Sequence, residues 1–387
     1  MTDGTTEGPA GAARAAGDGR PRVLLLGAGE LNRELAIALR RLGAEVTTTS
    51  TADELPAAIG RSRPDFVVSA ADTAFLDALD ALPDGERPEL VPSARAARLT
   101  ADREGLRRLA ADQLGLPTAP FWFAGSVGEL EAVAAHAGYP LLVKPVTGAS
   151  APGRSVIRHP DDIAPAWQRA AGAQPRPRVL AETVVDIEFD ITLYAVRSDG
   201  PRGPVIEFCS PIGHRRAEAG ELESWQPQQL TDAALDASRS IAARIVKALG
   251  GRGVFGVNLM INGDEVYFAD VSAGPRPSAW VTLRSQRLSV FDLQARAVLG
   301  LPVDTIMVSP GAARAIPPGR TAFPAAGALG GALAVPETDL LVFGPGSGPS
   351  DTTRPLGVAL ATAPDVAVAR DRARQVATAV NMRDSRG

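Results

Sequence analysis

Short apolar runs alternate with segments of helical periodicity over the first hundred residues. The runs are too short for helices and are bounded by turn residues, so they predict strands. They lie at Val23–Leu26, Glu45–Thr48, Asp65–Val68 and Leu90–Val91. After the first run, Leu35, Ala38 and Leu42 recur at helical spacing until Gly43. Strands alternating with helices indicate an open, doubly wound α/β domain over residues 21–99.

Residues 100–306 show longer strands and fewer helices. Strands are predicted at Leu141–Val146, Ser155–Ile157, Val179–Val185, Glu188–Leu193, Gly256–Met260 and Glu265–Val271. Helices are predicted at Thr100–Leu114, Asp161–Ala171 and Asp232–Leu249. The turn sequence Asn262-Gly263-Asp264 joins the last two strands as a hairpin. This part is therefore expected to be an α+β domain.

The two ends of the chain differ from the middle in composition. Residues 1–20 are rich in Gly, Ala and Thr and contain no apolar core of a signal peptide, so they predict a disordered tail. A Gly/Pro/Ala-rich stretch from Pro310 to Gly331 opens a small strand-rich domain, which we place at 307–387.

Composition excludes several classes of protein. The net charge of -4 argues against a nucleic-acid-binding surface, and the single cysteine, Cys209, excludes an internal disulfide framework. No apolar run is long enough to span a membrane, so we expect a cytoplasmic protein. Of the 40 basic residues, two are lysine, Lys144 and Lys247, and the remaining 38 are arginine. Because arginine is the usual basic residue of this chain, each lysine is a candidate for a specific function.

The turn after the first strand is the first candidate for chemistry. Gly27-Ala28-Gly29 leads from a strand into a helix, where backbone amides can meet a phosphate or carboxylate. The dinucleotide pattern would place a third glycine at Asn32 and an acid near Thr48, and both are missing. A small-anion site and a plain tight turn both remain open.

Two further candidates suit a nucleotide with its metal. Lys144 ends an apolar strand and precedes a glycine-bearing loop, so its ammonium can neutralise a phosphate; the alternative is a surface lysine. Asn258 and Asp270 lie on the predicted hairpin, and their oxygens suit Mg²⁺, although hairpin acids are usually solvated. The stretch Ser224–Gln229, downstream of His214, places a tryptophan among amides, either as a structural plug or as part of a site.

The chain resembles the formate-dependent glycinamide ribonucleotide transformylases, an ATP-grasp family of purine synthesis, over about residues 22–380. The matching stretches are Val23–Glu34, Asp102–Leu116, Leu142–Val146, Pro211–Leu230, Val254–Leu259, Val281–Ser285 and Leu356–Ala361. The resemblance implies an N-terminal pre-ATP-grasp domain, a central ATP-grasp domain and a small C-terminal domain. It also implies ATP and Mg²⁺ as cofactors, small-molecule carboxylate and amine substrates, and a homodimer.

The resemblance also assigns site residues, though no catalytic residue. It implies that the following residues bind ATP: Arg103, Lys144, Ser150, Gly153, Glu182, Val185 and Asp190. Glu182 and Val185 match the hinge whose backbone meets the adenine, and Asp190 matches the carboxylate that holds the ribose. The metal ligands would be Asn258 and Asp270. The substrate side would comprise Gly29, Glu30, Leu31, Arg276 and Arg354.

Several positions depart from the family pattern. Asn258 replaces one of two metal-binding glutamates, and Pro152 replaces a lysine of the phosphate-covering loop. On the acceptor side the departures are Ala70, Pro277 and Pro345. Ribonucleotide phosphates are normally held by several cations, each worth about 1.5–3 kcal/mol. Losing some of them favours a different acceptor.

Three hypotheses follow from the residues and the resemblance. The first is an enzyme that activates formate or another small carboxylate as an acyl phosphate and transfers it to an amine other than glycinamide ribonucleotide. The second is a catalytically degenerate relative that binds a nucleotide or metabolite. The third is the ordinary formate-dependent glycinamide ribonucleotide transformylase of purine synthesis.

Overall fold

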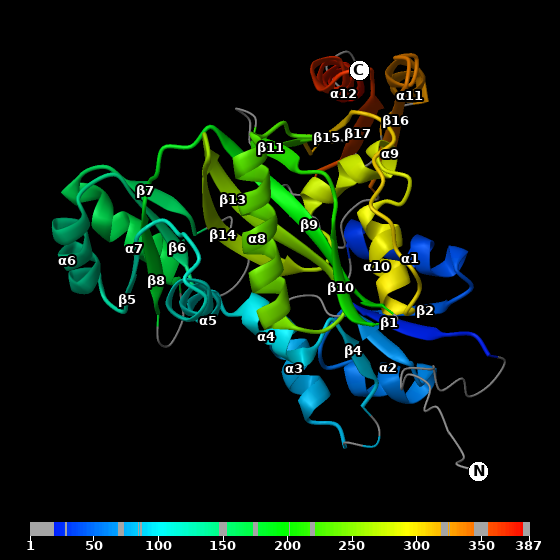
Figure 1. The fold of residues 1–387 in the computed structure, drawn as a ribbon, viewed down its shortest axis with the longest axis horizontal. Helices are drawn as coiled ribbons and strands as arrows, with labels where there is room; N and C mark the ends of the chain where they lie inside the picture. Colours follow the sequence, from blue (N-terminus) through cyan, green and yellow to red (C-terminus); the bar gives the residue numbers. More distant parts are fainter. Residues whose placement is uncertain are drawn as a thin grey trace, which may run out of the picture.

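The computed structural model describes residues 19–27, 29–68, 73–83, 85, 87–146, 153–172, 177–200, 202–216, 221–318, 324, 326–343 and 355–381. These residues form three sheets with helices packed around them (Figure 1). Within them, no helix combines the length and the apolar character that crossing a bilayer requires.

The N-terminal sheet is parallel and four-stranded, in the order β2-β1-β3-β4. Its strands are β1 (Arg22–Leu26), β2 (Glu45–Thr49), β3 (Phe66–Val68) and β4 (Glu89–Val91). Its helices are α1 (Glu30–Arg41), α2 (Leu55–Ser62), α3 (Thr73–Asp80) and α4 (Ala94–Ala101). Leu24 and Leu26 pack against α2 and α3, whereas Val23 and Leu25 pack with α1. Helices on both faces confirm the doubly wound domain that the alternating pattern predicts.

The central sheet has nine strands, in the order β14-β13-β9-β11-β12-β15-β17-β16 with β10 beside β9. Its first six strands along the chain are β9 (Phe189–Gly200), β10 (Gly203–Phe208), β11 (Ile212–Arg216), β12 (Leu222–Gln226), β13 (Gly253–Asn262) and β14 (Glu265–Ala273). One face is covered by α8 (Asp232–Leu249), and α10 (Val290–Val298) packs on the other. The predicted hairpin is β13–β14, and α8 has the predicted bounds.

A second four-stranded sheet, the small sheet, is antiparallel in the order β5-β8-β6-β7. It comprises β5 (Phe121–Ala124), β6 (Leu141–Pro145), β7 (Ser155–Ile157) and β8 (Val179–Thr183), with the helices α6 (Val127–Ala137) and α7 (Ile163–Ala171) and the short 3-10 turn η3 (Pro160–Asp162). It stands apart on the left of Figure 1, joined to the central sheet through α5 (Arg103–Arg108).

The single helix predicted over Thr100–Leu114 is wrong. Asp102 has an extended conformation between α4 and α5, and its carboxylate accepts a hydrogen bond from the Gly105 N–H at 3.0 Å. Aspartate favours this capping role over a helix interior, so the chain ends one helix and starts another there. After α5 the helix widens into the π-helical turn η2 (Leu109–Gln113).

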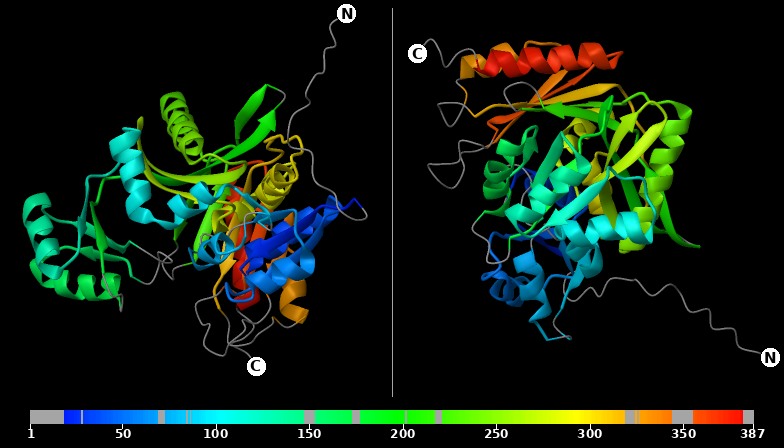
Figure 2. Two further views of the ribbon diagram at one scale, coloured as in Figure 1. Left: turned by 90° about the horizontal axis from the view of Figure 1, so that it is seen from below. Right: turned by 90° about the vertical axis from the view of Figure 1, so that its left-hand side faces the viewer.

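The C-terminal region is strand-rich, as predicted, but its strands continue the central sheet. They are β15 (Gly311–Ile316), β16 (Thr338–Val342) and β17 (Gly357–Thr362), with helices α11 (Ala326–Ala332) and α12 (Val366–Asn381). β15 pairs with β12, and α12 lies along the outer side of β15 and β17 (Figure 2). The short helical segments η4 (Pro277–Val281) and α9 (Thr282–Ser285) lie beside these strands.

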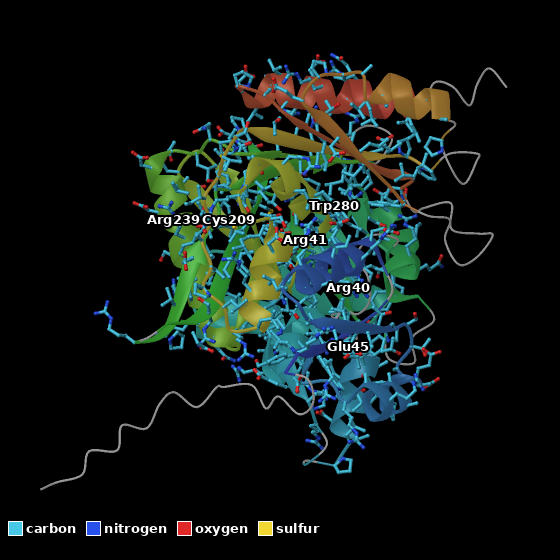
Figure 3. All side chains as sticks on the ribbon, turned by 90° about the vertical axis from the view of Figure 1, so that its right-hand side faces the viewer. Arg40, Arg41, Glu45, Cys209, Arg239 and Trp280 are labelled. Carbon is cyan, nitrogen blue, oxygen red and sulfur yellow. The ribbon has the colours of Figure 1, made fainter. Side chains whose placement is uncertain are left out.

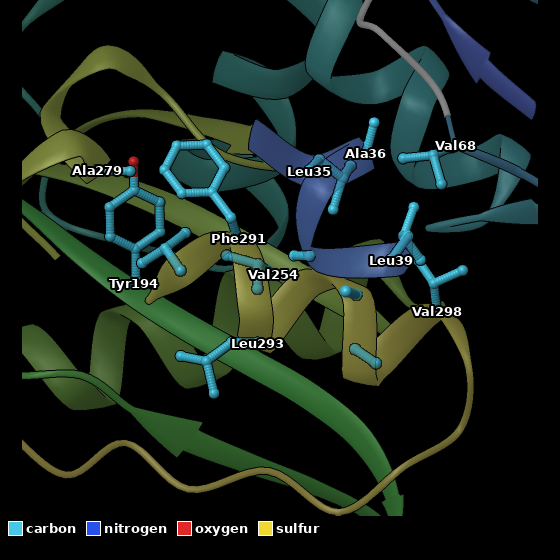
Figure 4. Packing of buried hydrophobic residues seen from close by; sticks show 14 of the residues in the cluster. Leu35, Ala36, Leu39, Val68, Tyr194, Val254, Ala279, Phe291, Leu293 and Val298 are labelled. Carbon is cyan, nitrogen blue, oxygen red and sulfur yellow. The ribbon is translucent and has the colours of Figure 1, made fainter. Parts of the chain in front are cut away.

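One core cluster joins the N-terminal domain to the central sheet. Leu35 and Leu39 of α1 pack towards Phe291 and Val298 of α10, with Tyr194 of β9 on the far side (Figure 4). Arg40 and Arg41 are exposed in the last turn of α1 (Figure 3), where the helix dipole favours positive charge. The packing of α1 on α10 fixes where the turn before α1 lies relative to the central sheet.

Candidate functional site

Three charged residues meet between the small sheet and the central sheet. Glu182 on β8 is buried and forms ion pairs with Lys144 on β6 and Arg107 on α5. Although burial acts to raise it, the pKa of Glu182 is lowered, because Lys144 and Arg107 lie beside its carboxylate. Burial lowers the pKa of Lys144, and Glu182 opposes that shift. The surface-lysine alternative for Lys144 is therefore wrong.

Arg103 extends this cluster towards the β13–β14 hairpin. Its guanidinium donates to the Pro145 carbonyl and lies within electrostatic range of Asp270, Arg276 and Glu182. Burial lowers the pKa of Arg103, and Asp270 opposes that shift. The structure thus brings together residues that the sequence assigned separately to ATP, metal and substrate.

Asn258 and Asp270 lie opposite each other on β13 and β14, as expected of a shared site. The Asn258 Oδ1 accepts a hydrogen bond from the Thr192 hydroxyl at 2.9 Å. The Asp270 Oδ2 lies 3.0 Å from the Arg276 Nη2 in an ion pair. No group of three or more His, Cys, Asp or Glu side chains suited to a metal occurs in the described part of the chain.

A chain of hydrogen bonds connects these two residues through the fully buried Tyr194. The Arg276 N–H donates to the Tyr194 hydroxyl at 2.9 Å, and the Tyr194 and Ser278 hydroxyls lie 3.3 Å apart. Ser278 donates to Thr192 at 3.1 Å, and Thr192 donates to Asn258. Burial raises the pKa of Tyr194 to about 12, so its hydroxyl stays protonated. The chain fixes the orientation of the Asn258 amide.

Asp190 lies at the exposed start of β9, opposite His214 of β11 in the strand register. The His214 Nε2 is buried and has no hydrogen-bond partner among the described residues. Burial lowers the pKa of His214, and Asp190 opposes that shift. Paired residues of adjacent antiparallel strands share a face, so His214 lies on the face that carries Asp190, Thr192 and Asn258. The resemblance did not assign His214 a role.

The glycine turn lies between β1 and α1 of the N-terminal domain. Gly27 has a φ of 89°, and Asn32 donates to the carbonyls of Leu26 and Gly27 at 2.8 Å each. Asn32 therefore holds the turn where a dinucleotide site would need glycine. Gly29 precedes α1, and Glu30 in its first turn pairs with Arg33 at 3.6 Å. Leu31 packs against the main core.

The remaining assigned positions divide into described and undescribed ones. Gly153 is buried, and a Cβ there would lie 2.5 Å from Pro145, so only glycine fits. Val185 is half-buried two residues after β8 ends, which shortens the strand predicted over Val179–Val185. Ser150 and Arg354 lie outside the described residues, as do the departures Ala70, Pro152 and Pro345. Lys247 is exposed in the last turn of α8.

The tryptophan–amide stretch has the geometry of a structural plug. The Trp225 indole N–H donates to Gln228 at 2.8 Å, and the Arg370 guanidinium lies 4.0 Å from the ring centre. Arg370 also pairs with the buried Glu223 at 3.0 Å. These contacts join β12 to α12, and the ring is buried.

Comparisons with known proteins agree with this geometry. Residues 109–291 match the family model of the ATP-grasp domain, and residues 321–380 match the model described as PurT, C-terminal. The formate-dependent phosphoribosylglycinamide formyltransferase of Corynebacterium glutamicum (strain R) is 44% identical over 386 residues, covering 93% of this chain and 94% of the relative. That of Rhodococcus jostii is 43% identical, with 94% and 95% covered.

Solved structures give the same result. The structure of glycinamide-RNase-transformylase T from Mycobacterium tuberculosis superposes with a TM-score of 0.78 at 61% identity, covering 93% of this chain and all (100%) of that chain. Carboxyaminoimidazole ribonucleotide synthase from Aspergillus clavatus, complexed with ATP, reaches a TM-score of 0.80 at 21% identity and covers 93% and 98%. The second likeness establishes a shared fold alone.

Proposed function

The chain belongs to the formate-dependent phosphoribosylglycinamide formyltransferase family, an ATP-grasp family, and from this premise we propose that it transfers a formyl group from formate to the amine of glycinamide ribonucleotide. It is an ATP-dependent enzyme by family. The observation that carries the proposal is the charged cluster between the two sheets, in which Lys144 pairs with Glu182, Arg276 pairs with Asp270, and Arg103 lies within electrostatic range of both carboxylates. Cations from one side and a carboxylate–guanidinium pair from the other suit a reaction between two anions.

Two group transfers account for the reaction. A formate oxygen attacks the γ-phosphorus of ATP, the bond from that phosphorus to the β–γ bridging oxygen breaks, and ADP leaves. The amine nitrogen then attacks the carbonyl carbon of formyl phosphate, the bond from that carbon to the phosphate oxygen breaks, and phosphate leaves while the nitrogen loses a proton. Lys144 and Arg103 would neutralise the phosphates, and formyl phosphate would have to be kept from water.

The donor set fits a magnesium ion that arrives with the nucleotide. Mg²⁺ is commonly held by one or two carboxylates together with substrate phosphates. Asp270 offers one carboxylate and Asn258 one amide oxygen on the facing strand, and we propose both as ligands. Such an ion would neutralise charge on the phosphates. Arg276 would share Asp270 with it.

The comparisons favour glycinamide ribonucleotide over the unknown amine of our first hypothesis. That hypothesis rests on Ala70, Pro277 and Pro345, and the first and last lie outside the described residues. Pro277 begins η4, a position where proline suits the helical start, so local structure accounts for it. We propose that Gly29, Glu30 and Leu31, together with Arg276 and Arg354, bind the acceptor.

Other assignments are part of the same proposal. We propose that Ser150 and Gly153 cover the phosphates, that the backbone of Glu182 and Val185 meets the adenine, and that Asp190 holds the ribose. The domain limits 21–99, 100–306 and 307–387, a homodimer and a cytoplasmic location complete it.

A formyl-transfer assay tests the proposal. The chain is incubated with ATP, Mg²⁺, formate and glycinamide ribonucleotide, and ADP and the formylated product are measured. We expect product only with all four components, and we expect Lys144→Met to abolish it while the matched variant Lys247→Met does not. ADP release only with another amine would refute the acceptor. ATP binding without turnover would support a degenerate relative instead.

A further inference from the structure

Arg107 is a buried arginine that no ligand assignment uses. Its side chain is 4% exposed, and it lies between the two sheets. Its Nη1 donates to the Phe268 carbonyl at 3.1 Å, and its Nη2 donates to the Ala269 carbonyl at 3.0 Å and to Glu182. Its guanidinium also lies 5.5 Å from the centre of the Phe121 ring. Arg107 therefore ties β8 of the small sheet to β14 at the residue before Asp270.

Glu182 divides its two carboxylate oxygens between two cations. Oε1 accepts from Arg107, and Oε2 accepts from Lys144. The Lys144 side chain is 18% exposed, compared with 4% for Arg107 and 5% for Glu182. Lys144 is thus the partner that solvent or a ligand can reach, and Arg107 is the partner buried between the sheets.

This division matters when Lys144 binds a phosphate. A lysine that turns towards a nucleotide gives up its pairing with Glu182, and a buried carboxylate without a partner is strongly unfavourable. With Arg107 in place, Glu182 keeps one charged hydrogen bond throughout. Arg154 also attracts Glu182 but is exposed, and Arg103 already donates to Pro145.

We infer that Arg107 is a positioning residue, which holds Glu182 ionised and in place so that Lys144 can exchange Glu182 for a nucleotide phosphate. The inference rests on the proposed function, since it requires ATP at Lys144. The lowered pKa of Glu182 agrees with it. A lysine at position 107 would not replace the arginine, because only the planar guanidinium can serve two carbonyls and a carboxylate together.

The test compares ligands with and without phosphates. ATP and adenosine affinities are measured by titration for the wild type, Arg107→Met and Arg107→Lys, with KM for ATP and for formate beside them. The matched control is Arg108→Met, because Arg108 is the next residue on α5, is 56% exposed, pairs with Glu104 at 2.7 Å and otherwise lies 5.7 Å from the centre of the Phe123 ring, without contacting Glu182. Unfolding in urea verifies that each variant is folded.

For Arg107→Met we expect the dissociation constant and the KM of ATP to rise roughly tenfold or more, while the adenosine affinity and the KM of formate stay within about twofold. Arg107→Lys should fall between, and Arg108→Met should match the wild type. Adding Glu182→Gln to Arg107→Met should restore ATP binding, since no carboxylate then competes for Lys144. If Arg107→Met does not fold, Arg107→Lys with and without Glu182→Gln makes the same comparison.

Three results would overturn the inference. Equal losses for ATP and adenosine would mean that Arg107 only supports the fold, and so would a failure of Glu182→Gln to restore ATP binding. Unchanged ATP affinity in Arg107→Met would mean that Lys144 can bind a phosphate without Arg107 holding Glu182. A wild-type chain that binds no ATP would refute the proposed function itself, which separates the two failures.

Discussion

Replacing Tyr194 by phenylalanine tests the hydrogen-bonded chain that orients Asn258 beside Asp270. The change removes one hydroxyl from a fully buried side chain and keeps the ring. It leaves the Arg276 N–H without its acceptor and removes the hydroxyl that lies 3.3 Å from the Ser278 hydroxyl. The hydrogen bonds from Ser278 to Thr192 and from Thr192 to Asn258 are then no longer anchored by Tyr194.

The magnitude follows from those contacts. A buried donor left unpaired costs about 1–3 kcal/mol, and removing a buried hydroxyl offsets part of that cost. We expect the free energy of unfolding to fall by about 2 kcal/mol. With a urea m-value of about 3 kcal/mol/M, the midpoint should fall by roughly 0.7 M. Because the pKa of Tyr194 is raised to about 12, the loss should be the same across neutral and mildly alkaline pH.

Urea unfolding followed by tryptophan fluorescence measures the effect, with Tyr267→Phe as the matched control. Tyr267 lies on β14 and donates to Glu265 at 2.7 Å in an exposed setting, so its loss should change stability by less than about 0.5 kcal/mol. A larger Mg²⁺ requirement is expected for Tyr194→Phe alone, because the Asn258 amide becomes free to turn. Equal stability losses in the two variants would refute the reasoning about the buried chain.

Three further predictions concern stability and reactivity. Although burial acts to raise it, the pKa of Glu223 is lowered, because Arg370 and Arg215 lie beside its carboxylate. The ionised carboxylate therefore stabilises the fold above the unfolded-state pKa, and this stabilisation is lost as the pH falls through the folded-state pKa. Between about pH 5 and about pH 3, the urea midpoint should fall more steeply for the wild type than for Glu223→Gln. A Cβ at Gly256 would lie 2.8 Å from Ser272, so Gly256→Ala should lose about 1–3 kcal/mol in the same assay, whereas Gly128→Ala, with open space around it, should lose none. Burial raises the pKa of Cys209 to about 12, so a thiol reagent should label it only after unfolding, and rapid labelling of the native chain would contradict its burial.

The elements that the sequence predicts best are those with strong local signals. The apolar run before Gly27 and the Asn262-Gly263-Asp264 turn specify β1 and the β13–β14 hairpin locally. The sequence does not predict β10, β11 and β12, because their residues alternate weakly. β10 forms a local hairpin with β9, whereas the pairing of β12 with β15 is long-range. The break at Asp102 has a local signal, a capping aspartate followed three residues later by Gly105, which the helical periodicity on both sides concealed.

The site divides in the same way. The resemblance assigns residues to ligands, and the structure brings some of them together, with Arg103 within electrostatic range of Asp270 and Glu182. Arg107 stands in the same matching stretch as Arg103, four residues later, yet nothing local distinguishes it from Arg108. Its partners lie 75 and 161 residues away, so its burial and its role become visible only when the two sheets are placed together.

That difference explains why ligand motifs leave part of the site unassigned. Lys144 belongs to the small sheet, whereas Asp270 lies on β14 of the central sheet and Arg276 follows that strand, so the proposed site exists only where the two sheets meet. A residue that joins the sheets without touching a ligand controls whether the ligand contacts can form together. Arg107 does this through the carbonyls of β14 and through the same carboxylate that holds Lys144. Because that carboxylate is buried, replacing Arg107 leaves Lys144 as its main partner. The effect should therefore be measured as the difference between the affinities for ATP and for adenosine.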